Sequence, residues 1–404
     1  MRLFLLLAIL VGPVAAADLT FTLNSTTGSG SPIRLAPEAN PPCLPPACVS
    51  FSGTLTDTDT DRSFLQLDSI SISFDPGNPS TGLSLDNTFM AVVPGLLSGD
   101  PNFAISGNPP NTYIGPIFGI DIVPGTVAGT YHAMVTVHAS GGAGDPGAVG
   151  FTVSKNITIT VAPSPTGGIA NAASAGQATP SVVSPGSYIA IYGNGLAGNG
   201  DPSAKSLPLP TTLNGASATL CGVPMPLLYA SATQINAIAP QVPAGSLQCP
   251  LVVSVNGQAS ASVQLTMAPL QPGIYTVNLS GSGPGVVTNA RTGQLISETN
   301  PAHAGDFLAI YATGLGAVQG PNGEAGPTDG AAAPLSTVFR TKAVVTATIG
   351  GVDAPVSFAG LTPTLAGLYQ VNVQVPTGAV PGSAVPLKIT AGDAGSNTVT
   401  IVVE

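Results

Sequence analysis

Apolar residues recur along this chain in short runs that are separated by Gly, Pro, Ser and Thr. Alternation of apolar and polar residues over four to eight positions predicts a β-strand with one buried face. The run "SYIAIYG" alternates in this way and stops at Gly193. In "CPLVVSVNGQASASVQLTM", Asn256-Gly257 predicts the tip of a β-hairpin. No long stretch has the helical period, so the pattern predicts an all-β protein.

An internal repeat organises the second half of the chain. Three pairs of segments match in the same order: Pro185–Leu196 with Ala304–Leu315, Ala218–Ala230 with Ala347–Ala359, and Gln234–Pro240 with Gln370–Pro376. The gaps between the segments vary, and each copy has roughly the length of a whole domain rather than of a solenoid repeat. The pattern therefore predicts two copies of one domain.

The strand pattern predicts three consecutive β-sandwich domains. About seven short strands in roughly 110 residues are typical of an immunoglobulin-like domain, and both repeats have this pattern. Pro/Gly/Ser-rich linkers, Ala162–Gly168 and Ala268–Gly273, separate the domains. The predicted boundaries are a signal peptide at 1–17, an N-terminal β-sandwich at 18–162, repeat 1 at 163–268 and repeat 2 at 269–404.

The N-terminus has the three parts of a secretory signal. Met1-Arg2 is a positive start, Leu3–Val11 is an apolar core, and Ala15-Ala16-Ala17 is a small-residue cleavage site. Nine apolar residues are too few to span a bilayer, which argues against a membrane anchor. We expect a secreted or cell-surface bacterial protein that begins at Asp18 and has no integral membrane segment in its mature form.

The charge balance excludes two classes of partner. Lys and Arg total 9 against 19 Asp and Glu, which gives a formal net charge of −10. A nucleic-acid-binding protein needs a basic surface to neutralise phosphates, so no nucleic-acid partner is expected. An anionic membrane surface would repel the chain for the same reason.

Export determines how the four cysteines are interpreted. In an oxidising compartment, Cys43 with Cys48 and Cys221 with Cys249 are expected to form two disulfides. The alternative is a metal site with four thiolates, but it would have to join two domains, and no histidine lies near either pair. Gly350 occupies the position of Cys221 in repeat 2, so the second disulfide is an addition to repeat 1.

The repeat region resembles a tandem module of unknown activity at the C-termini of secreted acidobacterial proteins. The stretches that carry the resemblance are "GIANAAS", "SPGSYIAIYGNGLA", "QINAIAP", "NPAHAGDFLAIYATGLGAV" and "GLYQVNVQVPTGAVPG". This resemblance implies an exported Ig-like or TIG-like fold and no catalytic motif. The N-terminal region is similar to β-sandwich domains of PEP-CTERM-type exported proteins through "SGTLTDTDTDRSFL", "GLSLDNTF" and "GPIFGIDIVPGTVAGTY".

No catalytic constellation is present in the sequence. It contains no G-x-S-x-G, no H-E-x-x-H and no phosphate-binding glycine loop. His132 and His138 would lie on one strand face, about 20 Å apart, which is too far to share a metal. His303 lies in a loop where repeat 1 has Ser184. We therefore expect a protein that is not an enzyme and requires no cofactor.

Both repeats contain a Gln-x-Asn tripeptide. Gln234 and Asn236, like Gln370 and Asn372, alternate with apolar residues and would share one strand face. They either line a polar binding face or tie neighbouring loops to the strand, and we favour the second interpretation because amides commonly do this.

The stretch "TLTDTDTDRSFLQLD" contains a candidate calcium site. Asp57, Asp59, Asp61 and Asp68 fit positions 1, 3, 5 and 12 of a calcium-binding loop, although Arg62 stands where that loop needs Gly. On a straight strand Asp57, Asp59 and Asp61 would project from one face about 6.7 Å apart, so calcium would require a curled segment. The alternative is a solvated hairpin without an ion.

The same stretch predicts a β-bulge. Leu65 and Leu67 are apolar at odd positions, whereas Ile70 and Ile72 are apolar at even positions. Both sets can face the core only if the strand register slips by one residue near Asp68.

These features predict a structural or adhesive role at the cell surface or in the extracellular matrix. The expected partner is an extracellular protein or glycan. The alternative function is carbohydrate binding, with Tyr113, Tyr229 and Tyr275 as loop-placed aromatic candidates. The low aromatic content of 5% and the absence of Trp count against this alternative.

Overall fold

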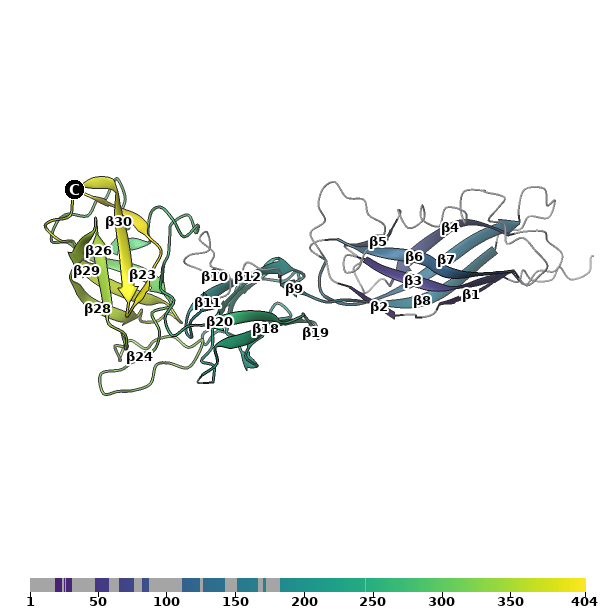
Figure 1. The fold of residues 1–404 in the computed structure, drawn as a ribbon, viewed down its shortest axis with the longest axis horizontal. Helices are drawn as coiled ribbons and strands as arrows, with labels where there is room; N and C mark the ends of the chain where they lie inside the picture. The colour runs from purple at the N-terminus through teal and green to yellow at the C-terminus, as the bar shows by residue number, and fades with distance from the viewer. Residues whose placement is uncertain are drawn as a thin grey trace, which may run out of the picture. The chain divides into compact units, whose positions relative to one another are not determined.

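The structure is a computed structural model. It describes the following residues: 19–23, 25, 27–30, 48–57, 65–75, 82–86, 111–123, 126–141, 151–165, 170–171, 182–243 and 245–404. The chain forms two compact units, one within residues 1–160 and one that holds 123–129 and 161–404. Figure 1 shows strands throughout both units, and no α-helix occurs among the residues described. The predicted signal peptide and Cys43 lie outside these residues.

The first unit contains two four-stranded sheets (Figure 1). One has the order β1-β3-β6-β5, with β1 Leu19–Leu23, β3 Cys48–Asp57, β6 Asn111–Ile122 and β5 Leu83–Leu85. The other has the order β2-β8-β7-β4, with β2 Thr27–Gly30, β8 Phe151–Val161, β7 Gly129–Gly141 and β4 Leu65–Phe74. This is the β-sandwich that the strand pattern predicts.

Alternation along the strands builds the core of this unit. On β7, Val135 and Val137 are fully buried, whereas Met134, which lies between the buried Ala133 and Val135, is exposed. Phe51 of β3 and Phe118 of β6 stack with ring centroids 4.7 Å apart. Since side chains on a strand point to opposite faces in turn, a period of two gives one apolar face per sheet.

The predicted bulge is confirmed. Leu67 of β4 pairs with Ala139 of β7, and Ser69 pairs with His138, so Asp68 is the extra residue. A slip of one residue shifts by one which positions along the strand share a face.

Repeat 1, in the second unit, consists of two sheets. The first has the order β10-β12-β17-β16 with β9 beside β12, where β9 is Ser164–Pro165, β10 Ala170–Asn171, β12 Tyr188–Asn194, β17 Gln234–Ile238 and β16 Leu227–Ala230. The second has the order β11-β20-β18-β14-β13, with β15 beside β14 and β19 beside β18; its strands are β11 Val182–Val183, β20 Val263–Met267, β18 Gln248–Val255, β14 Ala216–Leu220, β13 Thr212–Leu213, β15 Val223–Pro224 and β19 Gln258–Ala259. Part of the predicted linker is thus a short strand, β9.

Repeat 2 also has two sheets. The first has the order β21-β23-β29-β28-β25-β24 with β22 beside β23, where β21 is Gly273–Ile274, β22 Val287–Asn289, β23 Phe307–Thr313, β29 Tyr369–Gln374, β28 Val356–Leu361, β25 Arg340–Thr341 and β24 Val318–Gln319. The second has the order β27-β26-β30-β31 with β32 beside β30, where β27 is Val352–Ala354, β26 Val345–Ile349, β30 Gly382–Ala391, β31 Ala394–Gly395 and β32 Val399–Val403.

The two repeats have the same strand register, which confirms the internal repeat. Ile191 pairs with Ile235 in repeat 1, and Ile310 pairs with Val371 in repeat 2, and all four side chains are fully buried. Strand β16 of repeat 1 and its equivalent β28 of repeat 2 each carry a register shift. The shifts lie at equivalent residues, between Leu227 and Tyr229 and between Val356 and Phe358. Each copy has its own apolar core. The two repeats are therefore consecutive Ig-like β-sandwiches.

The Asn256-Gly257 hairpin is confirmed as well. Both residues have positive φ, 49° and 81°, and they connect β18 to β19. Two residues with positive φ are what a tight turn between right-twisted strands requires, and Asn and Gly adopt this conformation most readily.

Among the residues for which structure is given, no helix is long and apolar enough to cross a membrane.

Candidate functional site

The structure corrects one interpretation of the aspartate stretch. Strand β3 ends at Asp57 and β4 begins at Leu65, and these strands belong to different sheets. The stretch therefore crosses from one sheet to the other and is not a hairpin, because a hairpin joins adjacent strands of one sheet. Asp59 and Asp61 lie outside the described residues, and Asp68 is the bulge residue. The calcium site stays a prediction.

The histidines lie where the strand pattern places them. His132 and His138 are both on β7, and their rings contact Thr158 at 3.1 Å and Ser71 at 3.0 Å. The ring of His303 lies 3.6 Å from the Asp306 carboxylate and 4.0 Å from that of Glu404, in an exposed loop. Each ring therefore has polar neighbours at the surface.

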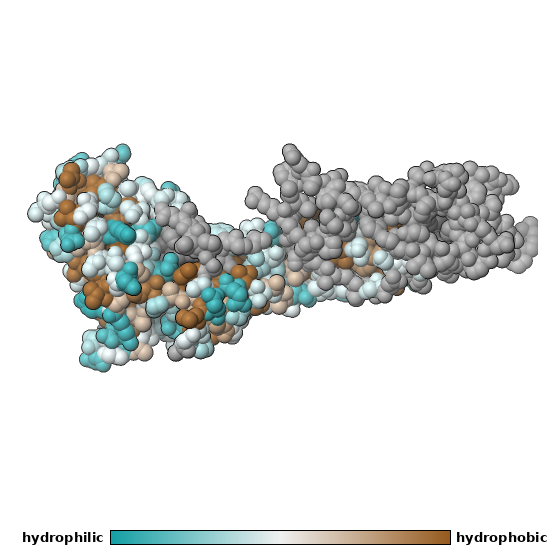
Figure 2. All heavy atoms as spheres, viewed as in Figure 1, coloured by the Kyte–Doolittle hydropathy of each residue, from teal (hydrophilic) through white to brown (hydrophobic). Residues whose placement is uncertain are grey.

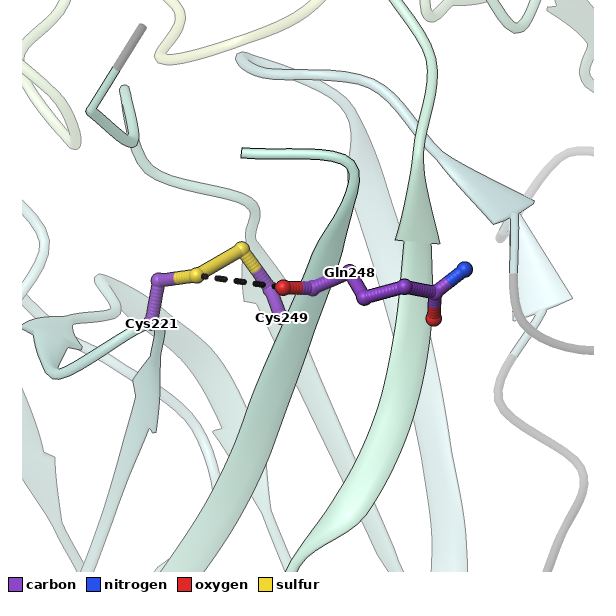
Figure 3. Close-up of a disulfide and its surroundings, with 3 residues drawn as sticks. All are labelled: Cys221, Gln248 and Cys249. Carbon is purple, nitrogen blue, oxygen red and sulfur yellow. Dashed lines mark hydrogen bonds between the residues drawn. A yellow bond between two sulfur atoms is a disulfide. The ribbon is translucent and has the colours of Figure 1, made fainter. Parts of the chain in front are cut away.

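The Cys221–Cys249 disulfide is confirmed, with a Cα–Cα distance of 4.7 Å (Figure 3). It excludes both sulfurs as thiolate metal ligands. The Cys221 Sγ also lies 3.8 Å from the Gln248 carbonyl oxygen, which is a packing contact because a disulfide sulfur carries no proton. Cys221 has a φ of 50°, and Gly350, its equivalent in repeat 2, has a φ of 63°. Cys48 is disulfide-bonded too.

A group of Cys48, Asp86 and Asp121 was not predicted from the sequence. The sulfur and one oxygen of each carboxylate lie within 4.8 Å of one another, and Asp86 is only 3% exposed. Cys48 is directly opposite Asp121 in the register of β3 and β6. Since Cys48 is in a disulfide, only two carboxylates could serve as ligands. Burial, with the nearby charge of Asp86, raises the pKa of Asp121, because both disfavour the charged form of the Asp121 carboxyl.

Tyr188 of repeat 1 forms the centre of a junction with repeat 2. Its hydroxyl donates to the carbonyl oxygen of Ala366 at 2.7 Å, and its backbone N–H donates to Thr313 Oγ1 at 2.9 Å. Burial raises the pKa of Tyr188 to about 12. The phenol is therefore held in its neutral, donating form across the ordinary pH range.

Two further hydrogen bonds and an apolar cluster complete the junction. The backbone N–H of Gln241 donates to Asp329 Oδ2 at 2.8 Å, and that of Leu209 donates to the Gly330 carbonyl oxygen at 2.8 Å. An apolar cluster joins the repeats through Leu209, Ile238 and Ala366, with Tyr188 packed against it.

Glycines permit this close approach. A Cβ on Gly367 would lie 2.8 Å from Ile238 Cδ1, and a Cβ on Gly330 would lie 2.8 Å from Pro226 Cβ. Both glycines also have positive φ, 63° and 80°. A larger residue at either position would push the repeats apart.

A cavity of about 280 Å³ lies beside this junction and is lined by both repeats. Its charged lining residues are Asp329 and Lys342, and Tyr369 contributes a hydroxyl that donates to the Gly316 carbonyl oxygen. Burial and the nearby Asp329 charge raise the pKa of Tyr369. Because both repeats line the cavity and Asp329 accepts the bond from Gln241 across the junction, the cavity is a part of that interface.

The Gln-x-Asn amides bond to each other in both repeats, not to loops. Gln234 Nε2 donates to Asn236 Oδ1 at 2.8 Å, and Gln370 Nε2 donates to Asn372 Oδ1 at 2.7 Å. The favoured interpretation, that these amides tie loops to the strand, is therefore wrong for this side-chain pair. The other interpretation, a polar face, fits the geometry.

Two of the aromatic candidates lie on strands, not loops. Tyr113 is on β6, and Tyr229 is on β16 with a partly exposed side chain. Tyr275 follows β21, and its pKa is raised by burial, with Thr313 as a hydrogen-bond partner. The side chains of Tyr229 and Tyr275 are both partly exposed.

No family model and no curated protein matches the chain. Among solved structures it is similar to the human desmocollin-1 ectodomain (10% identity, 96% of this chain and 59% of that chain, TM-score 0.18). It is also similar to domains 4–9 of the surface layer protein SbsC (13% identity, 96% of this chain and 47% of that chain, TM-score 0.19). A third similar structure is mouse cadherin-23 EC22–24 (9% identity, 96% of this chain and 98% of that chain, TM-score 0.18). The chain spans about half the length of the first two. TM-scores this low carry no argument, so the fold assignment rests on the strand topology.

Proposed function

We propose that this is an exported structural protein without enzymatic activity, whose two Ig-like repeats form a stiff spacer at the cell surface or in the matrix. The junction between the repeats supports this proposal most directly. Among the described residues, four hydrogen bonds and an apolar cluster connect the repeats, in addition to the linker. Modules connected only by a flexible linker move independently, whereas a bonded, packed interface fixes their orientation.

The signal-peptide pattern and the resemblance to exported acidobacterial modules support location outside the cytoplasm. The low charge and the absence of any catalytic motif in the sequence support a role that does not involve turnover. An extracellular protein or glycan is the proposed partner class.

Small-angle X-ray scattering on the full chain tests the stiff spacer. We compare wild type with Tyr188→Ala, and use Tyr192→Ala on the same strand as the matched control. The scattering of the wild type and of the control should fit one fixed arrangement of the two repeats. The Tyr188→Ala data should need a range of arrangements. A wild type that already needs such a range would overturn the proposal.

Location and activity are tested separately. Fractionation with an antibody should find the protein in the medium or the surface fraction, and retention in the cytoplasm would contradict the proposal.

A broad hydrolase panel should show no turnover. Activity that is lost in His303→Ala or Asp306→Ala would instead identify an enzyme.

A further inference from the structure

We propose that the outer face of one sheet in repeat 1 binds a neutral polysaccharide. The site consists of Tyr192, Tyr229, Gln234 and Asn236, which we term the tyrosine–amide face. Tyr192 is directly opposite Gln234 in the strand register, and Tyr229 is directly opposite Asn236. The proposal does not rest on the structural role of the protein.

The strand register shows that these four side chains point outward. Ile191 and Ile235, the neighbours of Tyr192 and Gln234 along their strands, are fully buried in the core of the repeat. Successive side chains on a strand point to opposite faces, so Tyr192 and Gln234 lie on the outer face. All four members of the tyrosine–amide face are partly exposed.

The amide pair presents fixed hydrogen-bonding groups. Gln234 uses one N–H in its 2.8 Å bond to Asn236 Oδ1, which orients both amides. This bond leaves the Gln234 carbonyl oxygen as an acceptor and the Asn236 NH₂ group as a donor. No other side-chain hydrogen bond of either amide occurs among the residues described. Adjacent sugar hydroxyls each donate and accept, so they match such a pair, and its fixed orientation lowers the entropy cost of binding.

The tyrosines supply the apolar part of the site. The C–H face of a pyranose ring packs on an aromatic ring, and a phenol hydroxyl adds a hydrogen bond at the edge. Ala190, opposite Asn236 and on the same face, is the smallest side chain available apart from glycine. Its side chain is only 3% exposed, so the accessible part of the site consists of the four partly exposed side chains themselves.

The surrounding charge favours an uncharged ligand. Asp201 and Lys205 flank Ser203, the bridge partner of Tyr229, and their opposite charges pair with each other at 3.1 Å. The whole chain carries a formal charge of −10, which repels polyanions. On the face shown in Figure 2, apolar and polar residues of the second unit are interspersed.

Repeat 2 carries an altered version of the same arrangement. Its equivalents are Tyr311, Phe358, Gln370 and Asn372. Phe358 has no hydroxyl, and the guanidinium of Arg340 lies 5.0 Å from its ring centroid. Because the Arg340 guanidinium packs over that ring, we assign the site to repeat 1. Repeat 2 provides matched control positions.

Affinity gel electrophoresis of the full chain tests the proposal. The probes are hydroxyethyl cellulose, soluble amylose and galactomannan, with alginate as the anionic control. Wild type should be retarded by at least one neutral probe and not by alginate. Tyr192→Ala and Tyr229→Ala should each weaken that retardation at least tenfold, whereas the equivalent Tyr311→Ala should change it less than twofold.

Asn236→Asp retains the shape of the side chain while replacing the NH₂ donor with an acceptor, so it tests the site without removing an aromatic ring. It should weaken binding at least fivefold with a melting temperature close to that of wild type. The proposal is overturned if no neutral probe retards the wild type, or if alginate binds more tightly. Unchanged retardation in Tyr229→Ala and Asn236→Asp, or an equal loss in Tyr311→Ala, also overturns it.

Discussion

Tyr188 and Phe307 occupy the same position in two copies of one fold, yet their surroundings differ. Tyr188 is enclosed in the junction between the repeats, whereas Phe307 is 50% exposed. Next to Phe307, Gln374 stands where repeat 1 has Ile238, a side chain that is only 2% exposed. The same end of the fold is therefore apolar where a second repeat covers it and more polar where none does.

The loop that precedes this strand is also more polar in repeat 2 than in repeat 1. His303 and Asp306 of repeat 2 replace the buried Ser184 and Ser187 of repeat 1. The backbone is unchanged, because Gly186 and Gly305 bond to the equivalent carbonyl oxygens at 2.7 and 2.9 Å. The core therefore determines the fold of each repeat, while contact with a neighbour determines the polarity of its ends.

Removing the disulfide should produce the largest difference between the repeats. Cys221 and Cys249 are 28 residues apart, and the chain-entropy relation gives about 3–4 kcal/mol for a loop of this length. In hydrogen exchange of the Cys221→Ala/Cys249→Ala variant, the backbone amides of repeat 1 should lose protection before those of repeat 2. Equal loss of protection in both repeats would show that they unfold as one unit.

Truncating the two equivalent aromatic residues tests the junction itself. Tyr188→Ala should cost about 3 kcal/mol of unfolding free energy, because it leaves a gap between the repeats and removes the bond to Ala366. Phe307→Ala should cost about 1 kcal/mol or less, since half of that side chain is already in water. Urea unfolding followed by circular dichroism measures both, and equal costs would refute the asymmetry.

Alkaline pH should weaken the junction through Tyr188. Its pKa is raised to about 12, so the folded state holds the phenol proton more tightly than the unfolded state, whose pKa is near 10. The stabilisation is complete below pH 10 and is lost as the pH rises from 10 to about 12. Its full size is about 3 kcal/mol, since each pKa unit corresponds to about 1.4 kcal/mol.

The matched variant for this test is Tyr188→Phe, which has no ionisable phenol at that position. Urea midpoints at pH 8, 10 and 11.5 should fall less steeply in Tyr188→Phe than in wild type. The slope should not vanish, because burial also raises the pKa of Tyr275 and Tyr369. Parallel slopes would show that Tyr188 makes no contribution.

The smallest effect is expected at the turn where the repeats differ. Gly350 has a φ of 63°, and an added Cβ would lie 3.3 Å from Val385 Cγ1. Gly350→Ala should therefore cost about 1 kcal/mol in thermal unfolding. Repeat 1 accommodates Cys221 at the equivalent turn with a φ of 50°. A neutral Gly350→Ala would show that this turn does not need glycine.

Local sequence pattern was sufficient for the strands, the repeat and the bulge at Asp68. Strand alternation and the match between "QINAIAP" and "QVNVQVP" depend only on neighbouring residues, and so does the Asn256-Gly257 turn. The Cys221–Cys249 pairing also followed from sequence grouping.

Features that depend on how sheets and repeats meet were not predictable in the same way. The stretch between Asp57 and Leu65 has turn residues, but those residues do not say whether the next strand joins the same sheet. Nothing near Tyr188 in the sequence indicates Ala366 as its partner, 178 residues away. Cys48, Asp86 and Asp121 come from three strand regions and meet only in the folded unit.

The junction has a direction that follows from its hydrogen bonds. In all four, repeat 1 supplies the donor: the Tyr188 hydroxyl and the backbone N–H groups of Tyr188, Leu209 and Gln241. Repeat 2 supplies only acceptors. Two copies of the repeat 1 end would bring donors against donors and leave buried N–H groups without partners, at a cost of roughly 1–3 kcal/mol each. The arrangement thus discriminates against like-to-like pairing of these ends between two molecules.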